Sequence, residues 1–390
     1  MLNLLKLTIS GIDRIGKTQQ IQLLGLGTSK ITHRLKQLIE YGDGWPALSK
    51  TAFHEWWFDH IEFDALVRII INGLKVRNDS CVPNKINIFD RGTLMFKAVL
   101  AATYTTKDLG SLEDAYDRVD DLFDDLLGYS PDEYELLLVP DIDYQRSIKP
   151  LIQIVDIRND QYTSEQTARY TTYQKYLDYA IKHYYIGMPH NQNVVVSSCL
   201  FDIQNEIRSR YNNAIGIKLP IICESFERAI ALGGLSESGK SSLGEILSKQ
   251  YGFYRLKLRY FEDILIRTGQ TVNANNMGFE FTSFLHCHPH ITQVSIESMH
   301  DPILPAYLKL LLADRFTIVF LTAPEELRIS RTANGAEMSI EKATTQVRQK
   351  DEIKRSRGAH QVEAIADLVF SNITDGVEIA ASEFAKQLCL

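Results

Sequence analysis

The chain has 390 residues, of which 45% are hydrophobic and 23% charged, with 22 glycines and 11 prolines. This length suits two domains of about two hundred residues each, and the composition excludes disordered, collagenous and low-complexity classes. The 42 basic and 49 acidic side chains give a formal net charge of -7, which provides no bulk field to attract long nucleic acids.

The N-terminal residues and the five cysteines indicate the compartment. Residues 1–9 are apolar but are interrupted by Asn3, Lys6 and Thr8 and lead into a glycine turn, so they predict a first strand rather than a signal peptide. The cysteines are scattered, odd in number and without a CxxC pair, which disfavours a disulfide framework. The sequence contains no run of eighteen apolar residues that would predict a membrane span. We therefore expect a cytoplasmic protein without a membrane partner.

Residues 11–18, GIDRIGKT, form a complete GxxxxGK[ST] motif between a predicted strand and a predicted helix at residues 18–24. Glycines let the backbone curl so that its amides point at one spot, and the helix adds its positive N-terminal dipole. We predict that Lys17 reaches the β- and γ-phosphates of ATP and that Thr18 holds the Mg²⁺ ion that bridges them. Further ATP-binding positions are predicted at Gly11, Ile15 and Gly16.

The same motif recurs at residues 234–241, GLSESGKS, after an apolar run at residues 229–232 and before a helical pattern. Here Lys240 is predicted to take the lysine role and Ser241 to bind Mg²⁺. The ATP-binding set predicted for this loop is Gly234, Glu237, Ser238, Gly239, Lys240, Ser241 and Ser242. For both loops the alternative is a glycine turn with a solvated lysine, or a loop that keeps the fold without catalysis.

The separation of the two loops predicts the domain organisation, because each half is long enough for a complete α/β unit. We predict two P-loop domains of the three-layer α/β/α type with parallel sheets, at residues 1–212 and 228–390. The intervening residues 213–227 have no helical period and contain Gly216 and Pro220, as a linker would.

Three segments of the first half carry a resemblance to a known family. They are GIDRIGKTQQ at residues 11–20, Asp-Arg-Gly at residues 90–92 after a predicted strand, and VVVSS at residues 194–198. With these motifs, about the first 210 residues resemble the thymidylate kinase family of P-loop enzymes. The resemblance implies that Arg14 helps to transfer the phosphoryl group, and that Asp13 holds the sugar 3'-hydroxyl of a deoxynucleoside monophosphate such as dTMP. A fixed guanidinium beside the β/γ bridge would stabilise the negative charge of the transition state.

Other side chains of the first half are predicted to serve the same reaction. Asp90 ends a predicted strand and could order Mg²⁺ through water, while Arg91 could clamp the acceptor phosphate with paired hydrogen bonds. A surface salt bridge is the alternative for this pair. Arg146 and Arg158 lie where the resemblance implies a mobile lid that excludes water; solvated loop charges are the alternative.

The first half also departs from that family. In place of an arginine-rich acceptor loop it has HEWWFDH at residues 54–60. Phe58 is predicted to stack on the acceptor base, with core packing as the equal alternative, since large aromatic side chains are usually buried. The acceptor therefore stays open to a modified nucleotide, a nucleic-acid base or a metabolite hydroxyl.

The second half contains VSIES at residues 294–298, LTAPEELRISR at residues 321–331 and KDEIKRSRGA at residues 350–359. With these segments, residues 228–390 are similar to dephospho-CoA kinases and related nucleoside monophosphate kinases. The similarity implies a cationic lid that surrounds the triphosphate, with Arg328 and Arg331 as candidate catalytic residues and Lys354 and Arg357 as further lid residues. A solvated helix with alternating charge is the alternative.

Two acids of the second half are candidates to orient an acceptor hydroxyl or Mg²⁺. They are Asp263 and Glu297, and we expect Glu297 to end its strand together with Ser298. Taken together, the sequence predicts a tandem kinase in which both domains bind ATP and Mg²⁺ and phosphorylate small acceptors. The alternative from another class is one active kinase domain joined to a non-catalytic nucleotide-binding domain that regulates it.

Overall fold

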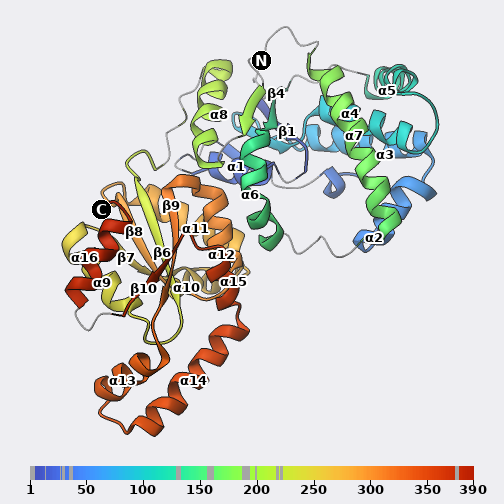
Figure 1. Cartoon of the computed structure of the whole chain (residues 1–390). Helices are drawn as coiled ribbons and strands as arrows, with labels where there is room; N and C mark the ends of the chain where they lie inside the picture. Colours follow the sequence, from blue (N-terminus) through green and yellow to red (C-terminus); the bar gives the residue numbers. More distant parts are fainter. Residues whose placement is uncertain are drawn as a thin grey trace. The chain divides into compact units, whose positions relative to one another are not determined.

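The computed structural model describes residues 5–13, 15–26, 28, 31–34, 38–128, 133–155, 162–186, 194–197, 200–216, 219, 223–373 and 377–390. The chain forms two compact units (Figure 1). Unit 1 comprises Met1–Ile142, Ile157–Ser198 and Asp202–Pro220, and unit 2 comprises Asp143–Asp156, Cys199–Phe201 and Ile221–Leu390. The predicted domain limits stay predictions, because this grouping does not show which part of the chain folds alone.

The sheet of unit 1 has five strands in the order β2-β3-β1-β4-β5, and each neighbouring pair is parallel. The strands are β1 (Leu5–Gly11), β2 (Ile31–Arg34), β3 (Ile86–Asp90), β4 (Tyr134–Pro140) and β5 (Val194–Ser197). The central strand β1 places Leu7 opposite Ile88 on one side and Ile9 opposite Leu136 on the other. These four side chains are buried, as the strands of a sheet covered on both faces require.

Helices cover both faces of the unit 1 sheet. Leu7 and Ile9 pack with residues of α1 (Lys17–Leu24) and α8 (Leu200–Ile215) in one apolar cluster. A second cluster joins α3 (Phe63–Asp79), α4 (Thr93–Thr106), α5 (Leu112–Leu127) and α7 (Ser164–Ile186) on the other side of the unit. The remaining elements of the unit 1 region are η1 (Leu38–Glu40), α2 (Lys50–Glu55), the π-helical η2 (Trp56–His60) and α6 (Ile142–Val155, mostly grouped with unit 2).

The sheet of unit 2 repeats the topology of unit 1. Its parallel strands lie in the order β10-β9-β6-β8-β7. They are β6 (Arg228–Gly234), β7 (Tyr254–Lys257), β8 (Gln293–Met299), β9 (Phe316–Thr322) and β10 (Leu368–Ser371). When the strands of each unit are ranked by their position in the chain, both sheets read 2-3-1-4-5 from one edge.

The unit 2 sheet also lies between helical layers. Alternate residues Ile230, Leu232, Val319 and Leu321 pack with α9 (Lys240–Tyr251) and α16 (Val377–Gln387), while α12 and α15 lie on the opposite side of the sheet (Figure 1). The other elements are α10 (Arg259–Arg267), α11 (Ala274–Cys287), α12 (Ile303–Leu312), η5 (Ala313–Arg315), α13 (Glu325–Gly335), α14 (Ile340–Ser356) and α15 (Ala359–Ala364).

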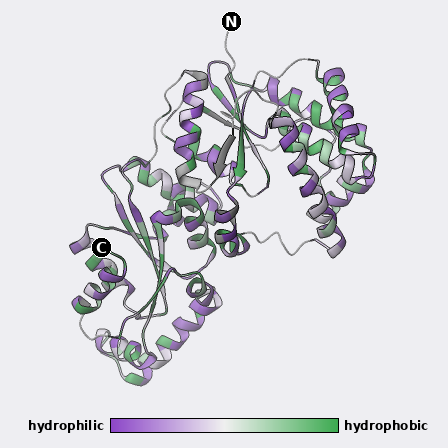
Figure 2. Ribbon diagram, turned by 45° about the horizontal axis from the view of Figure 1, so that its top comes forward, coloured by the Kyte–Doolittle hydropathy of each residue, from purple (hydrophilic) through white to green (hydrophobic). Residues whose placement is uncertain are grey.

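Helices α13 and α14 form a hairpin that projects from unit 2, and we call it the hairpin below (Figure 1). Its small core consists of Ile329, Ala333, Ala343 and Val347. Figure 2 shows that many residues of the hairpin are hydrophilic. A hairpin with so little apolar surface depends on polar contacts to keep its place on the unit.

The predicted fold class, three-layer α/β/α with parallel sheets, is confirmed in both units. One local expectation needs correction, because Glu297 does not end its strand: β8 continues to Met299. Among the described residues, no helix has both the length and the apolar character that crossing a membrane requires.

Candidate nucleotide-binding sites

The first loop joins β1 to α1 at the carboxyl end of the unit 1 sheet. Gly11 has φ +146°, and a Cβ atom there would lie 2.7 Å from the carbonyl oxygen of Leu138. Gly16 has φ +92° and caps α1. The loop emerges between β3 and β4, where the strand order reverses, which is the place where open parallel sheets bind their ligands.

Lys17 lies across this loop. Its side chain is buried, and Nζ donates a hydrogen bond of 2.8 Å to the carbonyl oxygen of Ile12. Burial lowers the pKa of Lys17 to about 8; Arg91 lowers it further, and Asp90 and Asp13 oppose the shift. The lysine therefore reaches a loop carbonyl, in the position from which a bound phosphate could attract it.

The structure brings together two predicted acceptor-binding residues, Asp13 and Arg91. The Arg91 guanidinium donates to Asp13 Oδ1, and the Tyr170 hydroxyl donates to Asp13 Oδ2 over 2.9 Å. Arg91 itself has φ +66°, an unusual conformation for a residue with a side chain, and its amide donates to Ile9 O over 2.9 Å. Tyr170, 157 positions along the chain, was missed by the sequence reasoning.

Asp90 and Thr18 fit the predicted magnesium site. Asp90 Oδ1 is buried and makes no hydrogen bond within the described part of the chain. The side chain of Thr18 is exposed in the first turn of α1. A carboxylate oxygen that lacks a donor is suited to a hydrated Mg²⁺ ion, and the hydroxyl could supply a further ligand.

A buried carboxylate beneath the first loop was also missed. Glu135 of β4 accepts hydrogen bonds from Ser10 Oγ (2.5 Å), from the Tyr185 hydroxyl, and from the amides of Leu94 (3.2 Å) and Met95 (3.3 Å). It thus joins the loop strand β1 to the start of α4. Burial raises the pKa of Glu135 to about 7, with a further contribution from Glu133. The sequence carried one signal for this buried carboxylate, a single glutamate within the otherwise apolar run of residues 134–139.

A second buried pair supports the turn after β3. The Arg77 guanidinium donates to Glu133 Oε2 (2.9 Å) and to the backbone oxygen of Arg91 (2.6 Å). Glu133 in turn accepts from the amide of Thr93 over 2.5 Å. These contacts hold the backbone of Arg91 in its left-handed conformation, so that the Arg91 side chain faces the loop.

The second loop joins β6 to α9 and is packed more closely. Gly234 has φ +131°, and a Cβ atom there would lie 2.4 Å from Leu321 O. Gly239 has φ +99°, and its Cβ atom would lie 2.1 Å from Nδ2 of Asn372, which donates to Ser238 O over 2.9 Å. Neither glycine position has room for a side chain, and Asn372 holds the loop from the end of β10.

Lys240 turns into the second loop. Its Nζ donates to Gly234 O (2.9 Å), Leu235 O (2.6 Å) and Ser238 Oγ (3.2 Å). Burial lowers the pKa of Lys240 to about 7, and Lys354 lowers it further. The ammonium group is therefore held inside the loop by groups that a phosphate could replace.

Glu297 contacts the magnesium-binding candidate of this loop. Ser241 Oγ donates to Glu297 Oε2 over 3.1 Å, and the Arg255 guanidinium donates to both carboxylate oxygens. A Cβ atom on Gly244 would lie 2.4 Å from Glu297 Oε1. Because both oxygens already accept hydrogen bonds, Glu297 suits a metal less well than Asp90 does, whereas the Ser241 hydroxyl remains a suitable ligand.

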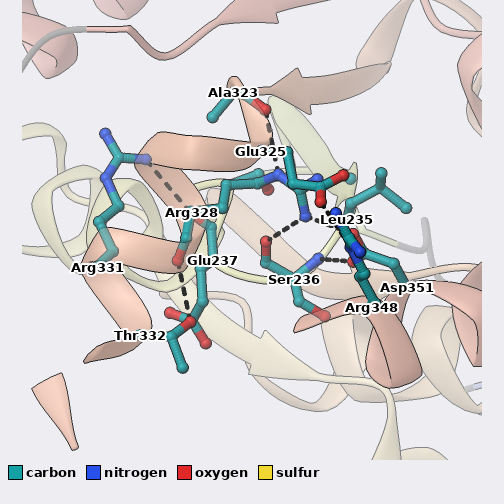
Figure 3. Close-up of polar contacts among 12 residues, drawn as sticks. Leu235, Ser236, Glu237, Ala323, Glu325, Arg328, Arg331, Thr332, Arg348 and Asp351 are labelled. Atoms are coloured by element: carbon teal, nitrogen blue, oxygen red, sulfur yellow. Dashed lines mark hydrogen bonds and ion pairs between the residues drawn. The ribbon is translucent and has the colours of Figure 1, made fainter. Parts of the chain in front are cut away.

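The two arginines at the start of the predicted lid differ in their surroundings (Figure 3). The Arg328 side chain is buried and donates to Ala323 O (3.1 Å), Ser236 O (3.2 Å) and Asp351 Oδ2 (2.5 Å). Arg331 instead extends toward the loop and donates to the backbone oxygens of Glu237 (3.3 Å) and Asn372 (3.4 Å). Their predicted part in phosphoryl transfer stays a prediction.

The other lid candidates, Lys354 and Arg357, lie at the end of α14. The pKa of His300 is lowered to about 3 by burial and by the positive charges of Lys354, Lys240 and Arg357. Burial also lowers the pKa of Lys354. The C-terminal end of α14 packs on the turn after His300, since a Cβ atom on Gly358 would lie 2.8 Å from Pro302. These cations therefore gather around His300, near the second loop.

Other predicted residues lie apart from the loops or cannot be placed. Phe58 is buried and packs on Tyr173, with ring centres 5.5 Å apart, as in the core-packing alternative. Asp263 is exposed on α10, 3.8 Å from Arg259. Arg146 is exposed on α6 and pairs with Asp143 at 3.5 Å. Arg14 and Arg158 lie outside the described residues. The functional roles proposed for these five residues stay predictions.

Metal-binding clusters are absent in the described ranges: no group of three or more His, Cys, Asp and Glu side chains is arranged to hold an ion. This observation concerns all-protein ligand sets. A magnesium ion bound largely by substrate phosphates and water needs fewer protein ligands.

No protein-family model and no curated protein match this sequence. Solved structures do match part of it. A shikimate kinase from Bacteroides thetaiotaomicron is 17% identical with a TM-score of 0.27, over 42% of this chain and 99% of that chain. A gluconokinase from Sinorhizobium meliloti 1021 is 15% identical with a TM-score of 0.26, over 42% and 97%. An uncharacterized protein from Eubacterium ventriosum is 10% identical with a TM-score of 0.32, over 42% and 98%.

Proposed function

We propose that both units are P-loop phosphotransferases that bind ATP with Mg²⁺ and transfer its γ-phosphoryl group to small acceptors. One observation carries this proposal. Two sheets of the same strand order each place a GxxxxGK[ST] loop at the point where the order reverses, with its lysine bonded to the loop backbone. A structural glycine turn has no need of a lysine directed at the loop backbone, whereas a triphosphate site uses this lysine to reach the β- and γ-phosphates.

In each unit the loop amides and the lysine would hold the β- and γ-phosphates. The bond from γ-phosphorus to the β–γ bridging oxygen breaks as a bond to the acceptor oxygen forms, and Lys17 or Lys240 stabilises the charge that develops. Thr18 or Ser241 would hold Mg²⁺, which would supply positive charge to offset the negative charge of the phosphates. Arg14 would add a second positive charge in unit 1.

For unit 1 we propose a deoxynucleoside monophosphate acceptor such as dTMP. Arg91 carries a planar guanidinium that matches a phosphate, and Asp13 beside it can accept from a sugar hydroxyl. A phosphate acceptor is already deprotonated at neutral pH, so its attack needs no general base among these side chains. The Arg91–Asp13 pair would separate as the acceptor binds between its members.

A second candidate function applies to unit 2, which could be a nucleotide-binding module that regulates unit 1. One observation favours it: both carboxylate oxygens of Glu297 already accept hydrogen bonds, from Arg255 and from Ser241. An acid occupied in this way is less available to orient an acceptor hydroxyl or a hydrated metal.

Single lysine replacements distinguish the two functions. If both units are kinases, Lys17→Ala and Lys240→Ala in the full chain should each remove a different phosphorylation, by about a hundredfold or more. Lys249→Ala is the matched control, because this exposed residue lies on α9 and forms an ion pair with Glu245 one turn earlier on the same helix. If Lys240→Ala abolishes nucleotide binding at the second loop without removing any phosphorylation, unit 2 is a module rather than an enzyme.

The acceptor is tested by following ADP release from the full chain with a panel of nucleoside and deoxynucleoside monophosphates. We expect dTMP or a related pyrimidine nucleotide to stimulate release, and Lys17→Ala to abolish the stimulation. Release with none of the monophosphates would overturn the acceptor assignment. Absence of ATP binding in both lysine variants and in the unaltered chain would overturn the phosphotransferase proposal.

A further inference from the structure

Ser236, the third residue of the second loop, is held at both of its backbone groups by the hairpin. Its amide donates to Asp351 Oδ1 over 2.9 Å, and its carbonyl oxygen accepts from Arg328 Nη1 over 3.2 Å. Arg328 Nη1 also donates to Asp351 Oδ2 over 2.5 Å, which closes a ring of contacts around the peptide units of Ser236 (Figure 3). We call Arg328 and Asp351 the clamp.

The clamp is sealed from solvent. Arg328 is 3% exposed and Asp351 is 2% exposed. A further hydrogen bond of Arg328 goes from Nε to the carbonyl oxygen of Ala323, just after the end of β9. A buried ion pair of this kind is weak evidence for stability but is strongly sensitive to the loss of either member. Nε and Nη1 of Arg328 have protein acceptors, so these two nitrogens hold the loop and its surroundings in place.

The residue that follows Ser236 adopts a strained conformation. Glu237 has φ +55°, in the left-handed region that residues with a side chain rarely occupy. Such a residue persists only where its surroundings hold it. The clamp holds the peptide before Glu237, and Arg331, from the same helix as Arg328, donates to the Glu237 carbonyl oxygen after it. Three residues of the hairpin therefore bracket the strained position.

We propose that Arg328 and Asp351 are positioning residues that keep the second loop in its nucleotide-binding shape by holding Glu237 in the left-handed conformation. This inference rests on the proposed binding of ATP at that loop. It makes the loop and the hairpin a coupled pair. Contacts that hold the hairpin against the second loop raise the affinity of that loop for nucleotide. By linkage, a bound nucleotide stabilises the hairpin in the same position.

The hairpin contains its own control. Glu325 and Arg348 form an ion pair of 2.8 Å that also joins α13 to α14, and these side chains are 38% and 69% exposed. Figure 3 shows this pair beside the clamp. Among the described residues, no hydrogen bond joins this pair to the loop backbone. Arg348→Ala therefore removes a hairpin contact without touching the loop, and exposed pairs of this type contribute little.

The test uses the full chain carrying Lys17→Ala, so that the second loop supplies the measured binding. A non-hydrolysable ATP analogue is titrated against this parent, against the parent with Asp351→Asn, and against the parent with Arg348→Ala. We expect Asp351→Asn to weaken binding by about tenfold or more, because it leaves the Arg328 charge buried without its counter-charge. We expect Arg348→Ala to change binding by less than about twofold.

A glycine at position 237 separates positioning from general stability. Glycine adopts a left-handed conformation without strain, so Glu237→Gly should let the loop keep its shape when the clamp is broken. Added to Asp351→Asn, it should restore most of the lost affinity, whereas a purely structural defect of the hairpin would not respond to it. Arg328→Lys, which keeps the charge but loses the planar fork, should give a smaller loss that Glu237→Gly also reverses.

The outcomes are distinct. If the parent binds the analogue and Asp351→Asn and Arg328→Lys bind equally well, the clamp proposal fails while the proposed function stands. Equal losses in the Arg348→Ala and Asp351→Asn variants, or losses that Glu237→Gly leaves unchanged, also overturn the clamp. A parent that binds no nucleotide overturns the proposed function of the second loop and the inference with it. Circular dichroism identifies any variant that has lost its fold, and Arg328→Lys then decides the question.

Discussion

Unit 1 and unit 2 share one strand order but hold their phosphate loops by different means. In unit 1 an acidic residue of the loop, Asp13, faces Arg91 and Tyr170, and the buried Glu135 ties the loop strand to α4. In unit 2 the loop carries Glu237 at a strained position, and the hairpin fastens the preceding residue. The first loop thus presents side chains outward, whereas the second is bound by its backbone.

The difference shows that two units with the same strand order can place the loop in the same way and still surround it with different residues. The carboxyl edge of the sheet fixes where a triphosphate would bind in both units, because the loop follows the first strand in each. The surroundings then decide what else the loop does. In unit 1 they form a set of side chains suited to an acceptor, and in unit 2 they connect the loop to a projecting hairpin.

The largest expected effect concerns the buried glutamates. Glu135→Ala should lower the free energy of unfolding of unit 1 by about 3 kcal/mol, because it leaves two hydroxyls and two amides without their acceptor. Tryptophan fluorescence during urea unfolding measures this unit, since Trp45, Trp56 and Trp57 are the three tryptophans of the chain and all lie in unit 1.

Glu297→Ala is the matched replacement in unit 2. It should leave the tryptophan transition in place, since its partners Arg255 and Ser241 belong to the other unit. If Glu135→Ala and Glu297→Ala shift that transition equally, the description of Glu135 as the support of the first loop is wrong.

A second prediction separates the two lysines by pH. Phosphate attracts the protonated lysine, so nucleotide binding takes up a proton wherever the lysine of the unbound protein is neutral. With a pKa of about 8 for Lys17 and about 7 for Lys240, binding should weaken between pH 7 and 9 by about tenfold at the first loop and about fiftyfold at the second. Nucleotide titrations of the Lys240→Ala chain measure the first loop alone, and those of the Lys17→Ala chain measure the second loop alone. An equal loss of affinity at both loops between pH 7 and pH 9 would contradict the difference between the two lysine pKa values.

The smallest expected effect concerns the contacts that Asp13 makes with Arg91 and Tyr170 at the first loop. Tyr170→Phe removes the hydroxyl that donates to Asp13, so the KM for the unit 1 acceptor should rise about threefold while the KM for ATP stays unchanged. Tyr179→Phe, on the same helix but 48% exposed, is the control. A change in the KM for ATP alone would assign Tyr170 to the nucleotide side.

The local elements were predictable because they depend on short-range rules. A strand pattern ending at Asp90 predicted β3, and the two loop motifs with their flanking patterns predicted that strands precede and helices follow them, as β1, α1, β6 and α9 do. The aromatic cluster at residues 54–60 was ambiguous, since packing and stacking use the same side chains. The structure buries Phe58, which a pattern of hydrophobicity does not distinguish from a substrate wall.

By itself, the sequence determined where the two loops lie, which lysine each carries, and that parallel sheets surround them, because a motif and its flanking periodicities involve neighbouring residues. Only the tertiary structure decided which distant side chains support each loop. Ser10 and Glu135 are 125 positions apart, and Ser236 and Asp351 are 115 apart. Such contacts depend on how helices pack against the edge of a sheet, and burial in that packing is what turns ordinary polar residues into the supports of a binding loop.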